Sequence, residues 1–199
     1  NNYCTITDSF TLRHLTDSLY FTTTLSNYNG VNISCKGYSD GWISIDTVIG
    51  GLPGYHFNWS NGDTSYLIDT LSANWYTGIL VDSFNCVFTD YIQIREPDFE
   101  LDTEIDTINP ACNGYCDGAL IANTIDGTPP YLFEWFDANN TLINTNDSVT
   151  ISSINNLCTG SYQLKVTDVN GCLNNIVTYL EEPLPLSINV DSTSLSLEI

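Results

Sequence analysis

Apolar and polar residues alternate along much of the chain with the period of a β-strand. Between residues 162 and 167, the apolar residues Tyr162, Leu164 and Val166 alternate with polar ones, so one face of this segment is expected to be buried and the other solvated. Turn-forming residues recur every eight to twelve positions, and no stretch shows the period of a helix. The pattern predicts an all-β protein.

The second half of the chain shows the strand pattern most clearly. Turns are expected at 127–130, 137–140 and 168–171, the last with an Asn-Gly pair that tolerates the positive φ of a hairpin. The expected strands lie near 99–108, 119–126, 131–136, 148–154, 161–167 and 174–181, with a short extra one near 141–144. Six or seven strands in about 85 residues are typical of an immunoglobulin-like sandwich, with Trp59 or Trp135 as its central core aromatic.

One string of residues occurs twice, which indicates tandem domains. The first copy contains Cys35, Gly37, Asp40, Gly41, Tyr55, Trp59, Tyr76, Asp82, Cys86, Glu96 and Pro97. The second copy contains Cys112, Gly114, Asp117, Gly118, Tyr131, Trp135, Tyr162, Asp168, Cys172, Glu182 and Pro183. We expect residues 1–15 to be the last strand of a truncated preceding repeat, 16–97 and 98–183 to be two immunoglobulin-like repeats, and 184–199 to begin another repeat or a linker.

Seven cysteines and only two histidines favour disulfides and an oxidising, extracellular compartment over a metal site. The first repeat holds one pair of cysteines. The second holds the equivalent pair and two more, which are then left to pair with each other. The expected bonds are Cys35–Cys86, Cys112–Cys172 and Cys116–Cys158. Cys4 is expected to pair with a cysteine outside the sequence.

The formal net charge of −20, from 24 acidic and four basic residues, argues against a nucleic-acid partner because little in the chain can neutralise phosphates. It argues equally against an anionic membrane surface, and no run of 18 or more apolar residues is present. The charge indicates either a solvated surface or divalent cation binding. The join between the repeats is the candidate calcium site, because one face of an extended strand would carry Asp98, Glu100, Asp102, Glu104 and Asp106.

One motif matches a catalytic pattern. Gly37, Ser39 and Gly41 satisfy the G-x-S-x-G pattern of a hydrolase nucleophile elbow. An elbow needs a helix after the serine, whereas residues 42–50 have the pattern of a strand, and the second repeat has Cys116 in place of the serine. We therefore expect no enzyme. We expect a tight turn instead, in which an aspartate binds backbone amides and the glycines adopt positive φ.

Longer motifs carry a resemblance to a known family. The segments CKGYSDG, GGLPGYHFNWSNG, YTGILVDSFNC and REP, then CNGYCDG, DGTPPYLFEW, YQLKVTDVNGC and EEP, resemble the SprB repeat of giant Bacteroidota surface adhesins over nearly the whole chain. Asn85, where the family usually has Gly, and the longer central loop and extra cysteine pair of the second copy depart from that pattern. The resemblance implies type IX secretion, exposure on the bacterial cell surface and a role in adhesion or gliding motility. It transfers no catalytic residues.

The leading hypothesis is therefore a structural spacer from a secreted adhesin or filamentous appendage. Its expected partners are neighbouring repeats of the same long chain, with self-association into a fibre or binding of a surface glycan as further candidates. The alternative is a module that binds carbohydrate or calcium directly. For carbohydrate, Trp75 beside Asn74 is the candidate contact, and because its counterpart is Ser161 the site would belong to one repeat. No cofactor other than calcium is expected.

Five Asp-Ser/Thr-aliphatic triplets resemble the O-glycosylation signal of Bacteroidota proteins. The acceptors would be Ser18, Thr47, Thr70, Thr107 and Ser148. The same triplets also suit turns and strand edges, because Asp caps backbone amides and Thr favours extended backbone. The sequence leaves both interpretations open.

Overall fold

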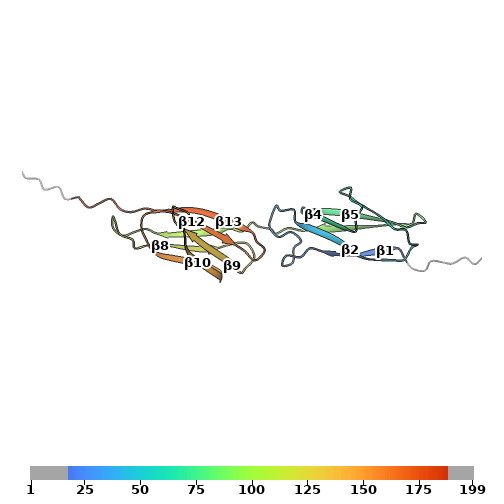
Figure 1. Ribbon diagram of the computed structural model, residues 1–199, viewed down its shortest axis with the longest axis horizontal. Coiled ribbons are helices and arrows are strands. Elements are labelled where there is room, and N and C mark those ends of the chain that lie inside the picture. The colour runs from blue at the N-terminus through green and yellow to red at the C-terminus, as the bar shows by residue number, and fades with distance from the viewer. Residues whose placement is uncertain (1–17, 188–199) are drawn as a thin grey trace, which may run out of the picture. The chain divides into compact units, whose positions relative to one another are not determined.

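The computed structural model describes residues 18–187 and is built from β-strands, with no helix in that part of the chain (Figure 1). The all-β prediction is therefore confirmed. The chain divides into two compact units, Asn1–Glu96 and Pro97–Ile199, called unit 1 and unit 2 below. Cys4, the expected strand at 1–15 and the stretch 188–199 lie outside the described residues.

Unit 1 consists of two antiparallel three-stranded sheets, in the orders β1-β2-β4 and β3-β5-β6. Its strands are β1 (Tyr20–Leu25), β2 (Gly41–Ile49), β3 (His56–Trp59), β4 (Leu67–Leu71), β5 (Asn74–Val81) and β6 (Val87–Ile94). Both sheets contribute to one core, in which Ile43 and Ile68 from the first sheet join Trp59, Leu80 and Ile94 from the second. Each strand thus buries one face, as the alternating pattern requires.

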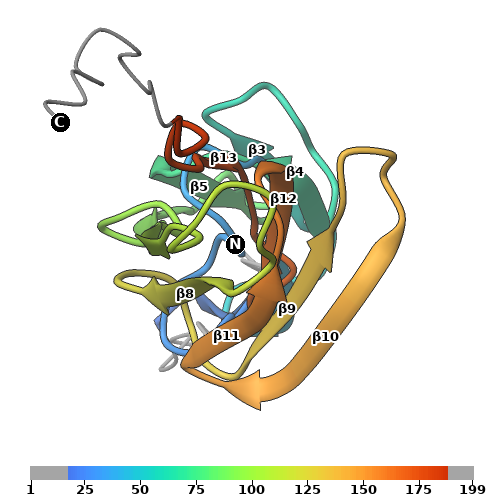
Figure 2. The same cartoon turned by 90° about the vertical axis from the view of Figure 1, so that its left-hand side faces the viewer.

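Unit 2 repeats this arrangement with one additional strand. Its strands are β7 (Thr103–Ile108), β8 (Gly118–Thr124), β9 (Tyr131–Phe136), β10 (Leu142–Val149), β11 (Ile151–Leu157), β12 (Gly160–Thr167) and β13 (Leu173–Leu180). The sheets have the orders β11-β8-β7 and β10-β9-β12-β13. Strand β10, which lies beside β9 at the edge of its sheet in Figure 2, is the strand without a counterpart in unit 1.

The predicted core tryptophans are both buried, and the polar atom of each ring has a partner. Trp59 is 4% exposed, and its Nε1 donates to the Ser65 carbonyl at 3.0 Å. Trp135 is fully buried, and its Nε1 donates to the Ser152 hydroxyl at 2.9 Å. Because a buried N–H without an acceptor would destabilise the fold, these bonds allow a large ring to lie at each centre.

The segment that joins the units differs from the prediction. Strand β7 begins at Thr103, so residues 98–102 precede the strand instead of forming its first half. Leu101 and Thr103 are buried, and the intervening Asp102 accepts a hydrogen bond from the Thr103 backbone amide at 2.8 Å. The alternation of acidic and apolar residues therefore begins before the strand ladder does.

Candidate functional site

A buried aspartate in unit 1 holds together the loops at the end of the sandwich where β1 begins, called the entry end. Asp82 is 2% exposed. Its Oδ1 accepts hydrogen bonds from the amides of Phe84 at 2.8 Å and Cys86 at 2.9 Å, and its Oδ2 accepts one from Leu52 at 2.9 Å. One carboxylate thus fixes the β5–β6 loop and connects it to the loop that precedes β3.

Unit 2 has the same entry clamp. Asp168 is 6% exposed, and its Oδ1 accepts hydrogen bonds from the amides of Asn170 and Cys172, both at 2.9 Å. Its Oδ2 accepts one from the amide of Thr128 at 3.0 Å. Three backbone donors on one carboxylate explain why aspartate occupies both positions, since a buried charge needs several such bonds.

The backbone amides that bind Asp82 also lower the pKa of its carboxyl group. Hydrogen bonds, above all the one from the Leu52 amide, hold the pKa of Asp82 below its usual range even though burial opposes the change. The pKa of Asp137, in the β9–β10 turn, is lowered in the same way, chiefly by the Thr141 amide. Donors to the ionised form stabilise it, so both carboxylates are charged at neutral pH.

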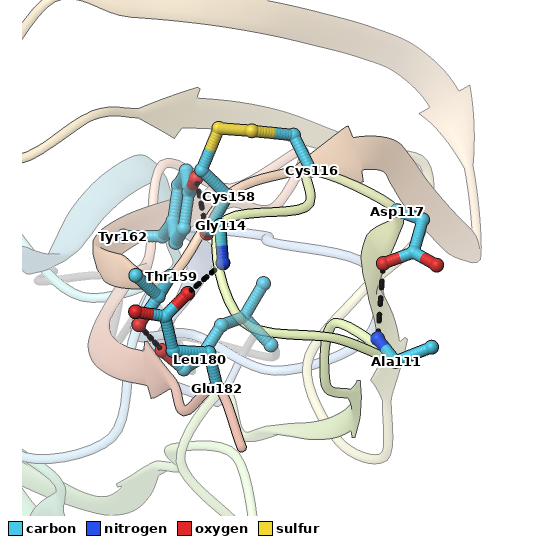
Figure 3. Close-up of a disulfide and its surroundings, with 9 residues drawn as sticks. All are labelled: Ala111, Gly114, Cys116, Asp117, Cys158, Thr159, Tyr162, Leu180 and Glu182. Atoms are coloured by element: carbon cyan, nitrogen blue, oxygen red, sulfur yellow. Dashed lines mark hydrogen bonds between the residues drawn. A yellow bond between two sulfur atoms is a disulfide. The ribbon is translucent and has the colours of Figure 1, made fainter. Parts of the chain in front are cut away.

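The opposite end, where the last strand leaves each unit, carries a second shared clamp. At this exit end, the Gly37 amide donates to Glu96 Oε2 at 2.6 Å in unit 1, and the Gly114 amide donates to Glu182 Oε2 at 2.7 Å in unit 2. The Glu-Pro sequence that marks each repeat therefore ties the departing chain to the loop before its second strand. Figure 3 shows the bond in unit 2.

The Asp-Gly pair beside this clamp was expected to form a tight turn with glycines at positive φ. Asp40 and Asp117 accept hydrogen bonds from the backbone amides of Ser34 at 3.1 Å and Ala111 at 3.0 Å, respectively. The aspartate roles are thus confirmed. Among the glycines, Gly37 and Gly114 have φ of 77° and 78°, as expected.

Gly41 and Gly118 differ from that expectation, because neither has positive φ and each instead begins a strand. A Cβ added to Gly118 would lie 3.0 Å from the Leu157 carbonyl oxygen and 3.1 Å from that of Ile108. Glycine is required there because backbone approaches closely on both sides. The G-x-S-x-G match thus lies in the exit-end loop up to its last glycine, Gly41, which begins strand β2.

The cysteines confirm one predicted bond and contradict two. Cys116 and Cys158 are joined by a disulfide, as predicted, beside the exit clamp of unit 2 (Figure 3). Cys86 and Cys112 are free and exposed, so the predicted bonds Cys35–Cys86 and Cys112–Cys172 are wrong. Cys35 and Cys172 are themselves disulfide-bonded.

Strand length explains the error. Cys86 directly precedes β6 at the entry end, whereas Cys35 lies at the exit end, where the amides of Asn32 and Ile33 donate to the Arg95 carbonyl just after β6. An eight-residue strand spans about 25 Å, and disulfide Cα atoms must lie within about 7 Å of each other. Unit 2 is equivalent, because β13 separates Cys172 from Cys112.

The acidic residues of the joining segment do not assemble into a site. All five are exposed: Asp98, Glu100, Asp102, Glu104 and Asp106. In residues 18–187, no three or more His, Cys, Asp or Glu side chains are grouped so that they could hold a metal ion. The expected calcium site required a strand from Asp98 onward, which would place all five carboxylates on one face. Strand β7 begins only at Thr103, so Asp98, Glu100 and Asp102 precede it.

The five candidate glycosylation acceptors share one property, which is exposure to solvent: Ser18, Thr47, Thr70, Thr107 and Ser148. Two of them also have unusual backbone. Thr70 and Ser148 have φ of 57° and 61°, and each hydroxyl donates to the carboxylate of the preceding aspartate, Asp69 at 2.8 Å and Asp147 at 3.3 Å.

The candidate ligand contact Trp75 is 59% exposed on the outer face of the β3-β5-β6 sheet. A second ring on that face, Tyr91, is 67% exposed and was not identified from the sequence. The alternation of residues in β6 indicates that Tyr91 faces outward, but only the register of β5 and β6 shows that it lies beside Trp75. The surface of the described residues also includes an open hollow in each unit.

The hollow in unit 1, of about 430 Å³, is lined by Tyr55, His56, Phe57, Asn58, Thr64 and Tyr66. The hollow in unit 2, of about 520 Å³, lies between β10 and β11, with Asp137, Asn144 and Tyr162 among its lining residues.

In the described part of the chain, no helix is long and apolar enough to cross a membrane. Comparison with models of known protein families and with curated proteins found no match to this sequence.

Proposed function

We propose that the chain is a structural spacer built from immunoglobulin-like repeats of an extracellular, cell-surface adhesin of the SprB-repeat type. The observation that carries the proposal is the occurrence of the same two clamps in both units, one at the entry end and one at the exit end. A spacer transmits force between its ends, so it needs loops fixed at the points where the chain enters and leaves.

The strand order supports an immunoglobulin-like assignment. In the constant type of that fold the first, second, fourth and fifth strands form one sheet and the third, sixth and seventh form the other, and the variable type adds strands beside the third. Unit 2 matches this order except that its fourth strand, β10, lies beside the third strand, β9, as an added strand does. The buried tryptophan on the third strand and a tyrosine that binds upstream backbone are further hallmarks. Tyr76 and Tyr162 donate to the carbonyls of Ser72 and Cys158, each at 3.0 Å.

The disulfides support an extracellular location, since such bonds persist in oxidising compartments. Placement at the cell surface and export by the type IX system rest on the motif resemblance alone.

The Cys116–Cys158 bond suggests how a spacer resists extension. The two cysteines are 42 residues apart, and this loop cannot be pulled out while the bond is intact. Because an extended chain spans about 3.3–3.6 Å per residue, the bond withholds roughly 140–150 Å of length. In the chain-entropy model it also stabilises unit 2 by about 4 kcal/mol.

Single-molecule force spectroscopy tests this proposal. Cys35 and Cys172 are also disulfide-bonded, so the experiment uses the Cys35→Ser/Cys172→Ser variant, in which a reductant acts on Cys116–Cys158 and not on these two cysteines. In this variant the reductant should lengthen one unfolding step by roughly 140–150 Å. Adding Cys116→Ser/Cys158→Ser should give the longer step without reductant. Extension of the oxidised chain without any discrete unfolding force would contradict a mechanical role, and a step that reductant does not change would contradict the locked loop.

A further inference from the structure

The outer face of the β3-β5-β6 sheet in unit 1 carries no charged side chain at its strand positions, although the chain as a whole is strongly acidic. Residues opposite one another in an antiparallel ladder share a face, so the register defines this surface. The residues on it, called the neutral face, are His56, Asn58, Trp75, Thr77, Ile79, Val81, Val87, Thr89, Tyr91 and Gln93.

Two large rings lie close together on the neutral face. Trp75 pairs with Gln93 and Thr77 pairs with Tyr91, so Trp75 and Tyr91 are diagonal neighbours on adjacent strands. Such neighbours are about 7–8 Å apart, within reach of aromatic side chains. Both rings are more than half exposed, and neither belongs to the core of unit 1. An exposed ring pair on a flat sheet is a candidate binding surface.

Hydrogen-bonding groups surround the rings. Gln93 is exposed and lies opposite Trp75. Thr77 lies opposite Tyr91 on β5, and Thr89 is on the same face of β6 as Tyr91. At the far edge of the sheet, His56 and Asn58 of the neutral face also line the 430 Å³ hollow in unit 1. The surface thus combines stacking platforms with amide and hydroxyl groups that can both donate and accept hydrogen bonds.

The corresponding face of unit 2 lacks this combination. Ser161 stands in place of Trp75, and Val177 stands in place of Tyr91. That face also carries an ion pair, in which Lys165 Nζ lies 2.7 Å from Glu134 Oε2. The two units share their clamps and core, so the fold does not require the rings of unit 1.

We propose that the neutral face binds a neutral polysaccharide, with Trp75 and Tyr91 as stacking platforms for successive sugars. The C–H groups on one face of a pyranose are attracted to the negative face of an aromatic ring. The hydroxyls of the sugar would form hydrogen bonds with the side chains of Gln93, Thr77 and Thr89. A net charge of −20 repels acidic polysaccharides and a second copy of the chain. The neutral face itself has no carboxylate to pair with a cationic ligand, so an uncharged ligand fits it best.

Affinity electrophoresis of the full chain tests the proposal. The probes are soluble mannan, dextran, xylan and β-1,3-glucan, with alginate as the acidic comparator. The test variant is Trp75→Ser/Tyr91→Val, which installs the residues that unit 2 carries at those positions. The matched control is Tyr179→Ser, because Tyr179 is also 59% exposed but lies on the equivalent face of unit 2.

At least one neutral probe should retard the wild type and the control, and the double variant should bind it about tenfold more weakly or worse, as for a central aromatic contact. Circular dichroism would show that the double variant is folded. Failure of all neutral probes to retard the wild type, equal retardation of the double variant, or binding of alginate alone would overturn the proposal. So would a change in oligomeric state on mutation without a change in glycan binding.

Discussion

At the residue scale, equivalent positions in the two units show what each position demands. The residue before the last position of β4 in unit 1, and of its counterpart β11 in unit 2, has left-handed backbone: φ is 57° at Thr70 and 59° at Asn156. Asparagine tolerates this conformation, whereas a β-branched side chain is rarely found there. Unit 1 is therefore strained at a point where unit 2 is not.

Thr70→Asn should accordingly stabilise unit 1. Relief of left-handed strain at a non-glycine residue contributes about 1 kcal/mol to the free energy of unfolding, so the variant should unfold at higher denaturant concentration. Thr47→Asn is the control, because Thr47 is an exposed strand residue without positive φ and asparagine is unfavourable in strands. A Thr70→Asn variant no more stable than wild type would show that the local structure already accommodates threonine.

At the element scale, strand length decides which cysteines can meet. Each unit places its two repeat-defining cysteines at opposite ends of an eight-residue strand, and the exposed loops before β6 and β8 are left with a free thiol each. The ends of a unit are therefore chemically distinct.

Maleimide labelling of the native, oxidised chain should modify Cys86 and Cys112 and spare Cys116 and Cys158. Exposed thiols react, whereas disulfide sulfurs do not. Peptide mapping identifies the sites, and Cys86→Ser or Cys112→Ser should each remove one of them. If both thiols resist labelling until a reductant is added, the pairing described above is incorrect.

The sequence predicted the elements better than their partners. Alternation and turn residues located most strands of unit 2 within a few positions, because both signals are local. The extra strand was expected at 141–144, but β10 extends to Val149. Two of the three cysteine pairs were wrong, because equal spacing in two repeats says nothing about which end of a strand each residue occupies. Tyr91 was missed for a related reason, since its proximity to Trp75 depends on the register of two strands.

At the scale of the whole molecule, acidity has opposite effects on stability. Self-repulsion among 24 acidic residues destabilises the compact state at neutral pH. Some of the same groups are nevertheless fixed by backbone amides. The lowered pKa values of Asp82 and Asp137 mean that these carboxylates hold fewer protons in the folded chain than in the unfolded one.

The stability that Asp82 contributes should be lost when the chain is acidified, while protonation of the other carboxylates relieves self-repulsion. A carboxylate with a lowered folded pKa stabilises the protein above the unfolded pKa of about 4, and this contribution is lost as pH falls through the folded value. Asp82→Asn should therefore melt at a lower temperature than wild type at pH 7, and the difference in melting temperature between the two should shrink between pH 5 and 2. Asp106→Asn, an exposed strand residue, serves as control. Parallel curves for wild type and Asp82→Asn would contradict the role of Asp82.

The clamps also allow the outward residues of a unit to change in evolution without any change in the residues that fix its ends. The aspartate and glutamate that fix the ends of each unit contact backbone amides, so they place almost no demand on the outward residues of the strands between them. Trp75 and Ser161 occupy the same framework position with unrelated chemistry. In a long chain of such units, the outward residues of each unit could therefore change independently of the other units, while the length of every unit stayed constant.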